Sequence, residues 1–287
     1  MAEPTVNKIT VPTLAELKAR GERIVMVTAY DAPSARLADE ASIDVVLVGD
    51  SAGTTVLGGS STVPVTMDEM LLFTREVMRG VSRALVVADM PFGSYQVSEN
   101  TAVENAIRFV KEAGAEAVKL EGAGRTLTRI SGIVDAGIPV MGHIGLTPQS
   151  ASMLGGYRAQ GRSAAAARRL IDEAIALERV GCFSIVLEAI PAVVAARITE
   201  ALKIPTIGIG AGPDCSGQVL VWHDLLGLTP DPMPRFVKKY ASLSTVITDA
   251  LAAYARDVRT GAFPEERHTY PMPEAERDRL ASQLTKK

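Results

Sequence analysis

The sequence reads Val46-Leu47-Val48-Gly49-Asp50-Ser51 and, further along, Leu85-Val86-Val87-Ala88-Asp89. Both stretches are unbroken apolar runs, which is typical of strands buried on both faces of a parallel sheet, and both lead into an aspartate. Similar short runs recur on either side of them, separated by segments with helical periodicity. We expect eight strands in all, at residues 24–29, 45–49, 84–88, 117–120, 139–142, 183–187, 206–209 and 219–222.

Helix signals lie between and around these strands. Thr66-Met67-Asp68-Glu69 and Thr13-Leu14-Ala15-Glu16 have the form of capping boxes, and the second predicts a short helix before the first strand. Apolar residues repeat at helical spacing over 236–258, which predicts a long amphipathic helix. The connection between Ile209 and Val219 is too short for a complete crossover helix, so we expect that unit to be abbreviated.

Eight strands alternating with helices in 287 residues favour a single (β/α)8 barrel over an open doubly wound sheet. We therefore predict an α/β TIM barrel with a short N-terminal helix and a C-terminal helical extension. Residues 1–262 are assigned to the barrel and its two terminal helices. Residues 263–287, rich in Pro, Glu and Arg, are expected to form a peripheral tail with some disorder.

Composition excludes several classes of function. The chain has 30 basic and 33 acidic side chains, a net charge of −3, and 47% apolar residues, so it can bury a large core. No basic block indicates nucleic acid or an anionic membrane as a partner, which leaves small molecules. The N-terminal residues lack the layout of a signal peptide, and the most apolar stretch, 182–196, is interrupted by Glu188 and Pro191. A cytoplasmic protein is expected.

Four carboxylates are predicted at the carboxyl ends of strands, where barrels of this type place their active sites. Asp50, Asp89 and Glu121 end three consecutive strands, and Glu188 ends the sixth. A single aspartate at such a place is often only a helix cap, but four together favour a site. Unpaired, they would repel one another until one bound a proton or a cation lay among them. Oxygen ligands without nearby Cys or paired His suit Mg²⁺.

Other polar residues at this rim are open to two interpretations. Lys119 lies two residues before Glu121, on the same face of its strand, and can either neutralise Glu121 or hold a substrate carboxylate. His143, at the end of the fifth strand, can be structural or catalytic. Cys182 and Cys215 have no C-x-x-C spacing and no paired base, so neither is expected to be a metal ligand, a disulfide or a nucleophile.

The ordered motifs resemble those of the ketopantoate hydroxymethyltransferase family over nearly the whole chain. Those that carry the resemblance are Thr28-Ala29-Tyr30-Asp31, Val48-Gly49-Asp50-Ser51, Pro64-Val65-Thr66, Ala88-Asp89-Met90-Pro91-Phe92, Lys119-Leu120-Glu121-Gly122, Gly142-His143-Ile144-Gly145-Leu146-Thr147-Pro148-Gln149-Ser150, Gly155-Gly156-Tyr157, Gln160-Gly161-Arg162 and Ile207-Gly208-Ile209-Gly210-Ala211-Gly212. The resemblance implies a (β/α)8 barrel that transfers a one-carbon unit from 5,10-methylenetetrahydrofolate to 3-methyl-2-oxobutanoate. The product would be 2-dehydropantoate, on the route to pantothenate and coenzyme A.

The resemblance also implies roles for particular residues. The metal-linked acidic positions of the family match Asp50, Asp89 and Glu121, for Mg²⁺. Its substrate contacts match Ser51, Lys119 and His143, with Asp50 and Asp89 also facing the substrate, and its proton-abstracting glutamate matches Glu188. On this view Mg²⁺ polarises the bound keto acid and stabilises the enolate that forms when Glu188 removes the C3 proton. No motif locates the folate.

The resemblance further implies a homo-oligomer, commonly a decamer of two pentameric rings, with the C-terminal helix as a candidate contact. Two alternatives are weighed against the transferase. Another Mg²⁺-dependent barrel acting on 2-oxo acids, of the phosphoenolpyruvate mutase or isocitrate lyase kind, is one, but the lyases of that group carry a Lys-Lys-Cys-Gly-His-type loop that is not in this sequence. The other is a barrel without turnover, which would be expected to lack a rim carboxylate or Lys119.

Overall fold

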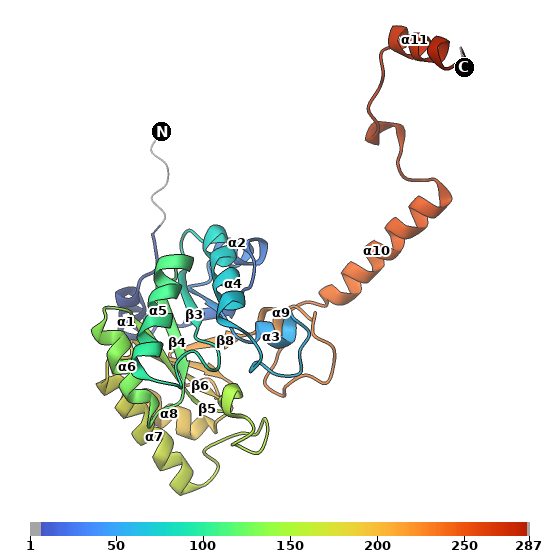
Figure 1. Ribbon diagram of the computed structural model, residues 1–287. Helices are drawn as coiled ribbons and strands as arrows, with labels where there is room; N and C mark the ends of the chain where they lie inside the picture. Colours follow the sequence, from blue (N-terminus) through green and yellow to red (C-terminus); the bar gives the residue numbers. More distant parts are fainter. Residues whose placement is uncertain (1–6, 286–287) are drawn as a thin grey trace. The chain divides into compact units, whose positions relative to one another are not determined.

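The computed structural model describes residues 7–285, and within them eight parallel strands close into a barrel in sequence order (Figure 1). The strands are β1 (Ile24–Thr28), β2 (Val45–Val48), β3 (Leu85–Asp89), β4 (Ala117–Glu121), β5 (Val140–Gly145), β6 (Ser184–Glu188), β7 (Thr206–Ile209) and β8 (Gly217–Leu220). Every neighbouring pair is parallel, and β8 pairs with β1 to close the barrel. The predicted fold class is confirmed.

Helices surround the strands as the alternating pattern predicts. They are α1 (Val11–Arg20), α2 (Ala32–Glu40), α3 (Ala52–Thr55), α4 (Met67–Gly80), α5 (Glu99–Ala113), α6 (Thr126–Asp135), α7 (Ala164–Arg179), α8 (Ala192–Ala201) and α9 (Trp222–Leu225), with a 3₁₀ turn η1 (Pro148–Ser150) after β5. The predicted capping box begins α4, where the Thr66 hydroxyl accepts from the Glu69 N–H and the Glu69 carboxylate accepts from the Thr66 N–H. Leu71 and Val77 on its buried face pack into the core.

Two apolar clusters hold the barrel together. The larger lies between the strands and the helices and includes Val46, Phe109 and Ile185. The smaller fills the barrel interior, where Met141 and Ile207 pack together with Leu14 of α1. Because α1 contributes to the interior cluster, the N-terminal end of the barrel is filled with side chains. The opposite end, where the strands end in polar residues, is left for a site.

The structure corrects four details of the predicted elements. The fifth strand is Val140–Gly145 instead of 139–142. The last strand is Gly217–Leu220 instead of 219–222, and Trp222 begins α9. Helix α1 begins at Val11 with Thr10 as its N-cap, so Thr13 is the last residue (N3) of the capping box and not the first. The predicted C-terminal helix begins seven residues later than expected, as α10 (Leu243–Thr260). The abbreviated unit between β7 and β8 is confirmed, since no helix separates them in the structure's element order.

The chain divides into two compact units, and the first ends at Tyr240. The boundary predicted from the sequence lies later, at residue 262. The first unit contains the barrel. The second, residues 241–287, contains α10, a 3₁₀ turn η2 (Glu266–His268) and α11 (Glu274–Leu284), so much of the expected tail is helical. In residues 7–285 no helix combines the length and the apolar character that crossing a membrane requires.

Candidate active site

A cavity of about 240 Å³ lies at the carboxyl ends of the strands. The seven residues selected from the sequence all line it: Asp50, Ser51, Asp89, Lys119, Glu121, His143 and Glu188. They come from the ends of β2, β3, β4, β5 and β6, in the order in which the strands stand in the barrel. The structure therefore brings the whole predicted set to one place.

Asp50 and Asp89 are held side by side by a backbone contact. The Asp50 N–H donates to Asp89 Oδ2 at 3.0 Å, and both side chains are buried. Gly49 leaves room for the neighbouring Ser51 hydroxyl, because a Cβ at position 49 would lie 2.6 Å from it. The Ser51 hydroxyl is itself fixed by a 2.8 Å hydrogen bond with Tyr30.

The parallel register accounts for the ionic pairs of the site. Asp89 is the register partner of Lys119 across β3 and β4, and the Lys119 ammonium lies 2.8 Å from Asp89 Oδ1. In the same way Glu121 is the partner of His143 across β4 and β5, with 3.5 Å between Glu121 Oε1 and His143 Nδ1. Strand pairing thus sets Asp89 and Glu121 each beside a basic group.

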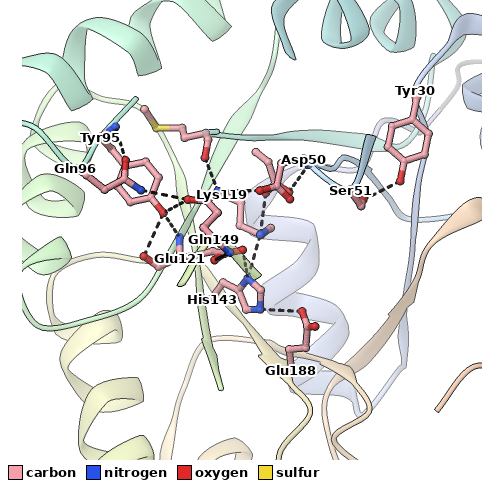
Figure 2. Close-up of polar contacts among 12 residues, drawn as sticks. Tyr30, Asp50, Ser51, Tyr95, Gln96, Lys119, Glu121, His143, Gln149 and Glu188 are labelled. Carbon is pink, nitrogen blue, oxygen red and sulfur yellow. Dashed lines mark hydrogen bonds and ion pairs between the residues drawn. The ribbon is translucent and has the colours of Figure 1, made fainter. Parts of the chain in front are cut away.

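His143 lies between several charged groups, as Figure 2 shows. Its Nδ1 is 3.1 Å from the Lys119 ammonium, and its Nε2 is 3.2 Å from Glu188 Oε2. Burial and Lys119 lower the pKa of His143, but Glu121 and Glu188 outweigh them and raise it to about 9. When the imidazole is neutral and Nδ1 accepts from the Lys119 ammonium, its one proton lies on Nε2, toward Glu188.

The negative charge of the acidic groups is only partly balanced by the basic groups of the site. Burial, with Asp89 and Glu121 nearby, raises the pKa of Asp50 to about 8. Burial also raises the pKa of Asp89, although Lys119 opposes this, while the three carboxylates raise the pKa of Lys119 despite its burial. At Glu121 burial acts to raise the pKa, but His143 and Lys119 outweigh it, so the pKa is lowered. Four carboxylates face two basic groups, so the cavity favours one more cation.

The donor set fits a hard divalent cation. Asp89 Oδ1 is buried and, within residues 7–285, receives no hydrogen bond beyond its ionic contact with Lys119. No three His, Cys, Asp or Glu side chains of the described chain already stand as a preformed metal cage. Mg²⁺ does not require one, because it is usually held by one or two carboxylates and keeps several waters. Asp50 and Asp89 supply such a pair of carboxylates.

Two further residues of the site were not predicted from the sequence. The Gln149 side chain donates to Asp50 Oδ2 at 2.9 Å, and its backbone N–H donates to Glu121 Oε2 at 3.0 Å. The buried Tyr95 hydroxyl donates to Gln149 Oε1 at 2.7 Å. Gln149 lies in a motif that the sequence analysis singled out, but nothing marked its side chain. Tyr95, in the loop after β3, gave no signal.

The fold and the site together define a (β/α)8-barrel enzyme with buried acidic and basic groups gathered at one mouth of the barrel. The profile of the family described as Ketopantoate hydroxymethyltransferase matches residues 8–266. The chain is 58% identical to the 3-methyl-2-oxobutanoate hydroxymethyltransferase of Moorella thermoacetica, over 92% of this chain and 98% of that one. With the enzyme of the same name from Carboxydothermus hydrogenoformans the identity is 55%, over 93% and 97%. The chain belongs to the ketopantoate hydroxymethyltransferase family, and it is a hydroxymethyl-transferring enzyme.

Solved structures show the same fold at low identity. A phosphonopyruvate hydrolase complex with oxalate and Mg²⁺ is 12% identical, with a TM-score of 0.59 and 96% of each chain covered. A 2,3-dimethylmalate lyase, a member of the phosphoenolpyruvate mutase/isocitrate lyase superfamily, is 15% identical, with a TM-score of 0.58 and coverage of 96% and 98%. At these identities the likeness concerns the fold alone.

Proposed function

We propose that the protein transfers a hydroxymethyl group from 5,10-methylenetetrahydrofolate to 3-methyl-2-oxobutanoate, giving 2-dehydropantoate for pantothenate synthesis. The observation that carries this proposal is the convergence of the seven rim residues on one cavity, with Glu188 on β6 and the acidic pair Asp50 and Asp89 after β2 and on β3. The names of the relatives support the acceptor and the product class. The folate donor rests on the family resemblance.

Substrate binding would draw on the basic groups and on the acidic cluster. The Lys119 ammonium is buried and lines the cavity, so it can pair with the carboxylate of the keto acid, and Ser51 offers a hydroxyl in the same cavity. Asp50, Asp89 and Glu121 would hold Mg²⁺. Bound there, the ion would act as a Lewis acid toward the keto oxygen and favour loss of the neighbouring C3 proton.

Glu188 is the group that would take this C3 proton. One of its oxygens faces His143 Nε2, and the side chain lines the cavity with 15% of its surface exposed. The other oxygen is free to approach the substrate carbon, since a carboxylate has several acceptor positions. The resulting carbanion equivalent would attack the methylene carbon of the iminium form of the donor, with the C=N electrons moving to nitrogen. Water would then replace that nitrogen on the transferred carbon, which supplies the hydroxyl group and releases tetrahydrofolate. His143 is placed to hold Glu188 in position and to contact the product.

The test is exchange of the C3 hydrogen of 3-methyl-2-oxobutanoate into deuterated water, followed by proton NMR with Mg²⁺ and without folate. Glu188→Gln keeps the shape of the side chain but removes the base. We expect exchange to fall by roughly 10²-fold or more, in line with the loss of a general base. Binding of the keto acid should be nearly intact.

The exposed Glu200 of α8, changed to Gln, is the matched control and should exchange like wild type. A Glu188→Gln protein that exchanges at the wild-type rate would remove Glu188 from this role. If wild-type exchange is unaffected by a chelator, the metal part of the proposal is wrong.

A further inference from the structure

The side-chain amide of Gln149 is completely engaged. Its nitrogen donates to Asp50 Oδ2 at 2.9 Å and to the Met90 carbonyl at 3.0 Å. Its oxygen accepts from the Tyr95 hydroxyl at 2.7 Å and from the Gln96 amide at 3.2 Å. These four hydrogen bonds use both donors and both lone pairs of the amide, and Gln149 is buried.

This arrangement permits only one orientation of the amide. A flipped Gln149 would set its oxygen against a carboxylate oxygen of Asp50 and the carbonyl of Met90, and its nitrogen against the Gln96 nitrogen. Tyr95 helps to fix this orientation, since its hydroxyl also accepts from the Glu121 N–H at 3.2 Å. The N–H group that faces Asp50 is therefore held in place by Met90, Tyr95 and Gln96, all in the loop between β3 and α5.

Gln149 also reaches a second acidic residue of the site. Its backbone N–H donates to Glu121 Oε2 at 3.0 Å (Figure 2). Gln149, in η1, thus contacts the carboxylates of Asp50 and Glu121 and the Met90 carbonyl. These three partners lie after β2, at the end of β4 and after β3. The Gln149 side chain is held at a buried place by the loop after β3, and it is not among the residues that line the cavity.

We propose that Gln149 is a positioning residue that orients the carboxylates of Asp50 and Glu121 for a divalent cation. One oxygen of each carboxylate accepts from Gln149, which restrains both carboxylates and leaves Asp50 Oδ1 for the ion, while Glu121 Oε1 faces His143. Groups that hydrogen-bond to metal ligands in this way usually change metal affinity 10- to 100-fold when they are removed. The inference rests on the metal site of the proposed function.

The experiment is direct binding of Mn²⁺, as a probe for Mg²⁺, to the full-length protein without substrates, measured by the electron paramagnetic resonance signal of the free ion. Gln149→Met keeps the length of the side chain but has no amide. We expect it to bind Mn²⁺ at least about tenfold more weakly than wild type. Tyr95→Phe, which releases only one of the four bonds, should weaken binding to a smaller extent.

Gln218 is the matched control. It is an exposed glutamine on β8 whose amide donates to the Gly212 carbonyl, so Gln218→Met should bind Mn²⁺ like wild type. A merely structural role would lower the melting temperature of Gln149→Met and leave its Mn²⁺ affinity unchanged, which would overturn the inference. If Gln149→Met does not fold, Tyr95→Phe decides, and wild-type affinity there overturns it. A wild-type protein that binds no Mn²⁺ would refute the metal site of the proposed function itself.

Discussion

At the scale of a residue, Asp50 shows that a functional side chain can lower the stability of the folded protein. Its carboxyl is buried beside Asp89 and near Glu121, and its pKa is raised to about 8. A carboxyl whose pKa is higher in the folded than in the unfolded chain contributes its stability at low pH. That contribution is lost as the pH rises from the unfolded value, near 4, through about 8.

Asp50→Asn should therefore stabilise the metal-free protein at high pH. At pH 9 the wild-type carboxylate is ionised and repelled, whereas the amide is neutral, and we expect a gain of about 1 kcal/mol or more, or a Tm rise of roughly 2–4 °C or more. At pH 5 both side chains are neutral in the folded protein and only about one pH unit of the interval from 4 to 8 has been crossed, so the difference should be much smaller. Thermal unfolding with a chelator at the two pH values measures this.

The exposed Asp68 of α4, changed to Asn, is the control and should shift the melting temperature little at either pH. Asp50→Asn should also lose any stabilisation that Mg²⁺ gives to the wild type. Equal melting temperatures of wild type and Asp50→Asn at pH 9 would contradict the raised pKa.

The sequence predicts charged site residues better than neutral ones. Asp50, Asp89 and Glu121 stand out because a charge directly after an apolar run is costly unless it has a use. Gln149 and Tyr95 are neutral, and their importance depends on which carboxylate they reach through three-dimensional space. No spacing along the chain encodes a contact between Gln149 and Asp50, which are 99 residues apart.

At the scale of elements, the end of β5 determines where Glu188 lies. Gly145 has φ +98°, a conformation that favours glycine, and a Cβ there would strike the Glu188 carbonyl. That carbonyl accepts from the Leu146 N–H at 2.8 Å, so β5 and β6 meet closely at the rim. Any side chain at Gly145 must displace the backbone that carries the proposed base.

Gly145→Ala should thus lower kcat by roughly 10- to 10²-fold, because small displacements of a catalytic group have large effects. Steady-state kinetics, with circular dichroism to confirm folding, measures the effect. Gly137→Ala separates this contact from backbone strain, since Gly137 has φ +83° but open space around it. It should lose some stability and keep its kcat. If the two variants lose kcat equally, the contact with Glu188 is not the cause.

The predicted strands were accurate where apolar runs are long and less so where glycine intervenes. β2, β3 and β6 read as continuous β-branched segments, and their predicted positions agree with the structure within one residue. β8 begins with Gly217 and Gln218, which are weak strand formers. The prediction followed the apolar residues after them and therefore placed the strand two residues too close to the C-terminus. Gly217 is selected by packing, because a Cβ there would strike the Ile24 carbonyl of β1.

At the scale of the whole molecule, the second unit presents an apolar helix face. In α10 the side chains of Ile247, Leu251, Tyr254 and Val258 recur at helical spacing, and no residue of this helix is buried. We propose, with the family resemblance, that the protein is a homo-oligomer and that this face takes part in the contact.

Leu251→Glu should weaken that assembly, because burying an unpaired carboxylate in an apolar interface is costly. Size-exclusion chromatography with light scattering should show a smaller particle at low micromolar concentration. Thr245→Glu lies on the opposite face of α10, in its first turn, where an acidic residue is tolerated, and it should leave the particle mass unchanged. Identical masses for Leu251→Glu and wild type would argue against α10 as a contact.

The pairing of β8 with β1 has a consequence for biosynthesis. Ile24 and Val27 find their register partners in Gly217 and Leu220, nearly two hundred positions downstream. While a ribosome is still translating the middle of the message, both edges of the growing sheet are open, and only late in translation can they join. The nascent polypeptide thus carries unpaired strand edges for most of its synthesis, the period in which edge-to-edge aggregation is favoured and chaperones are most useful.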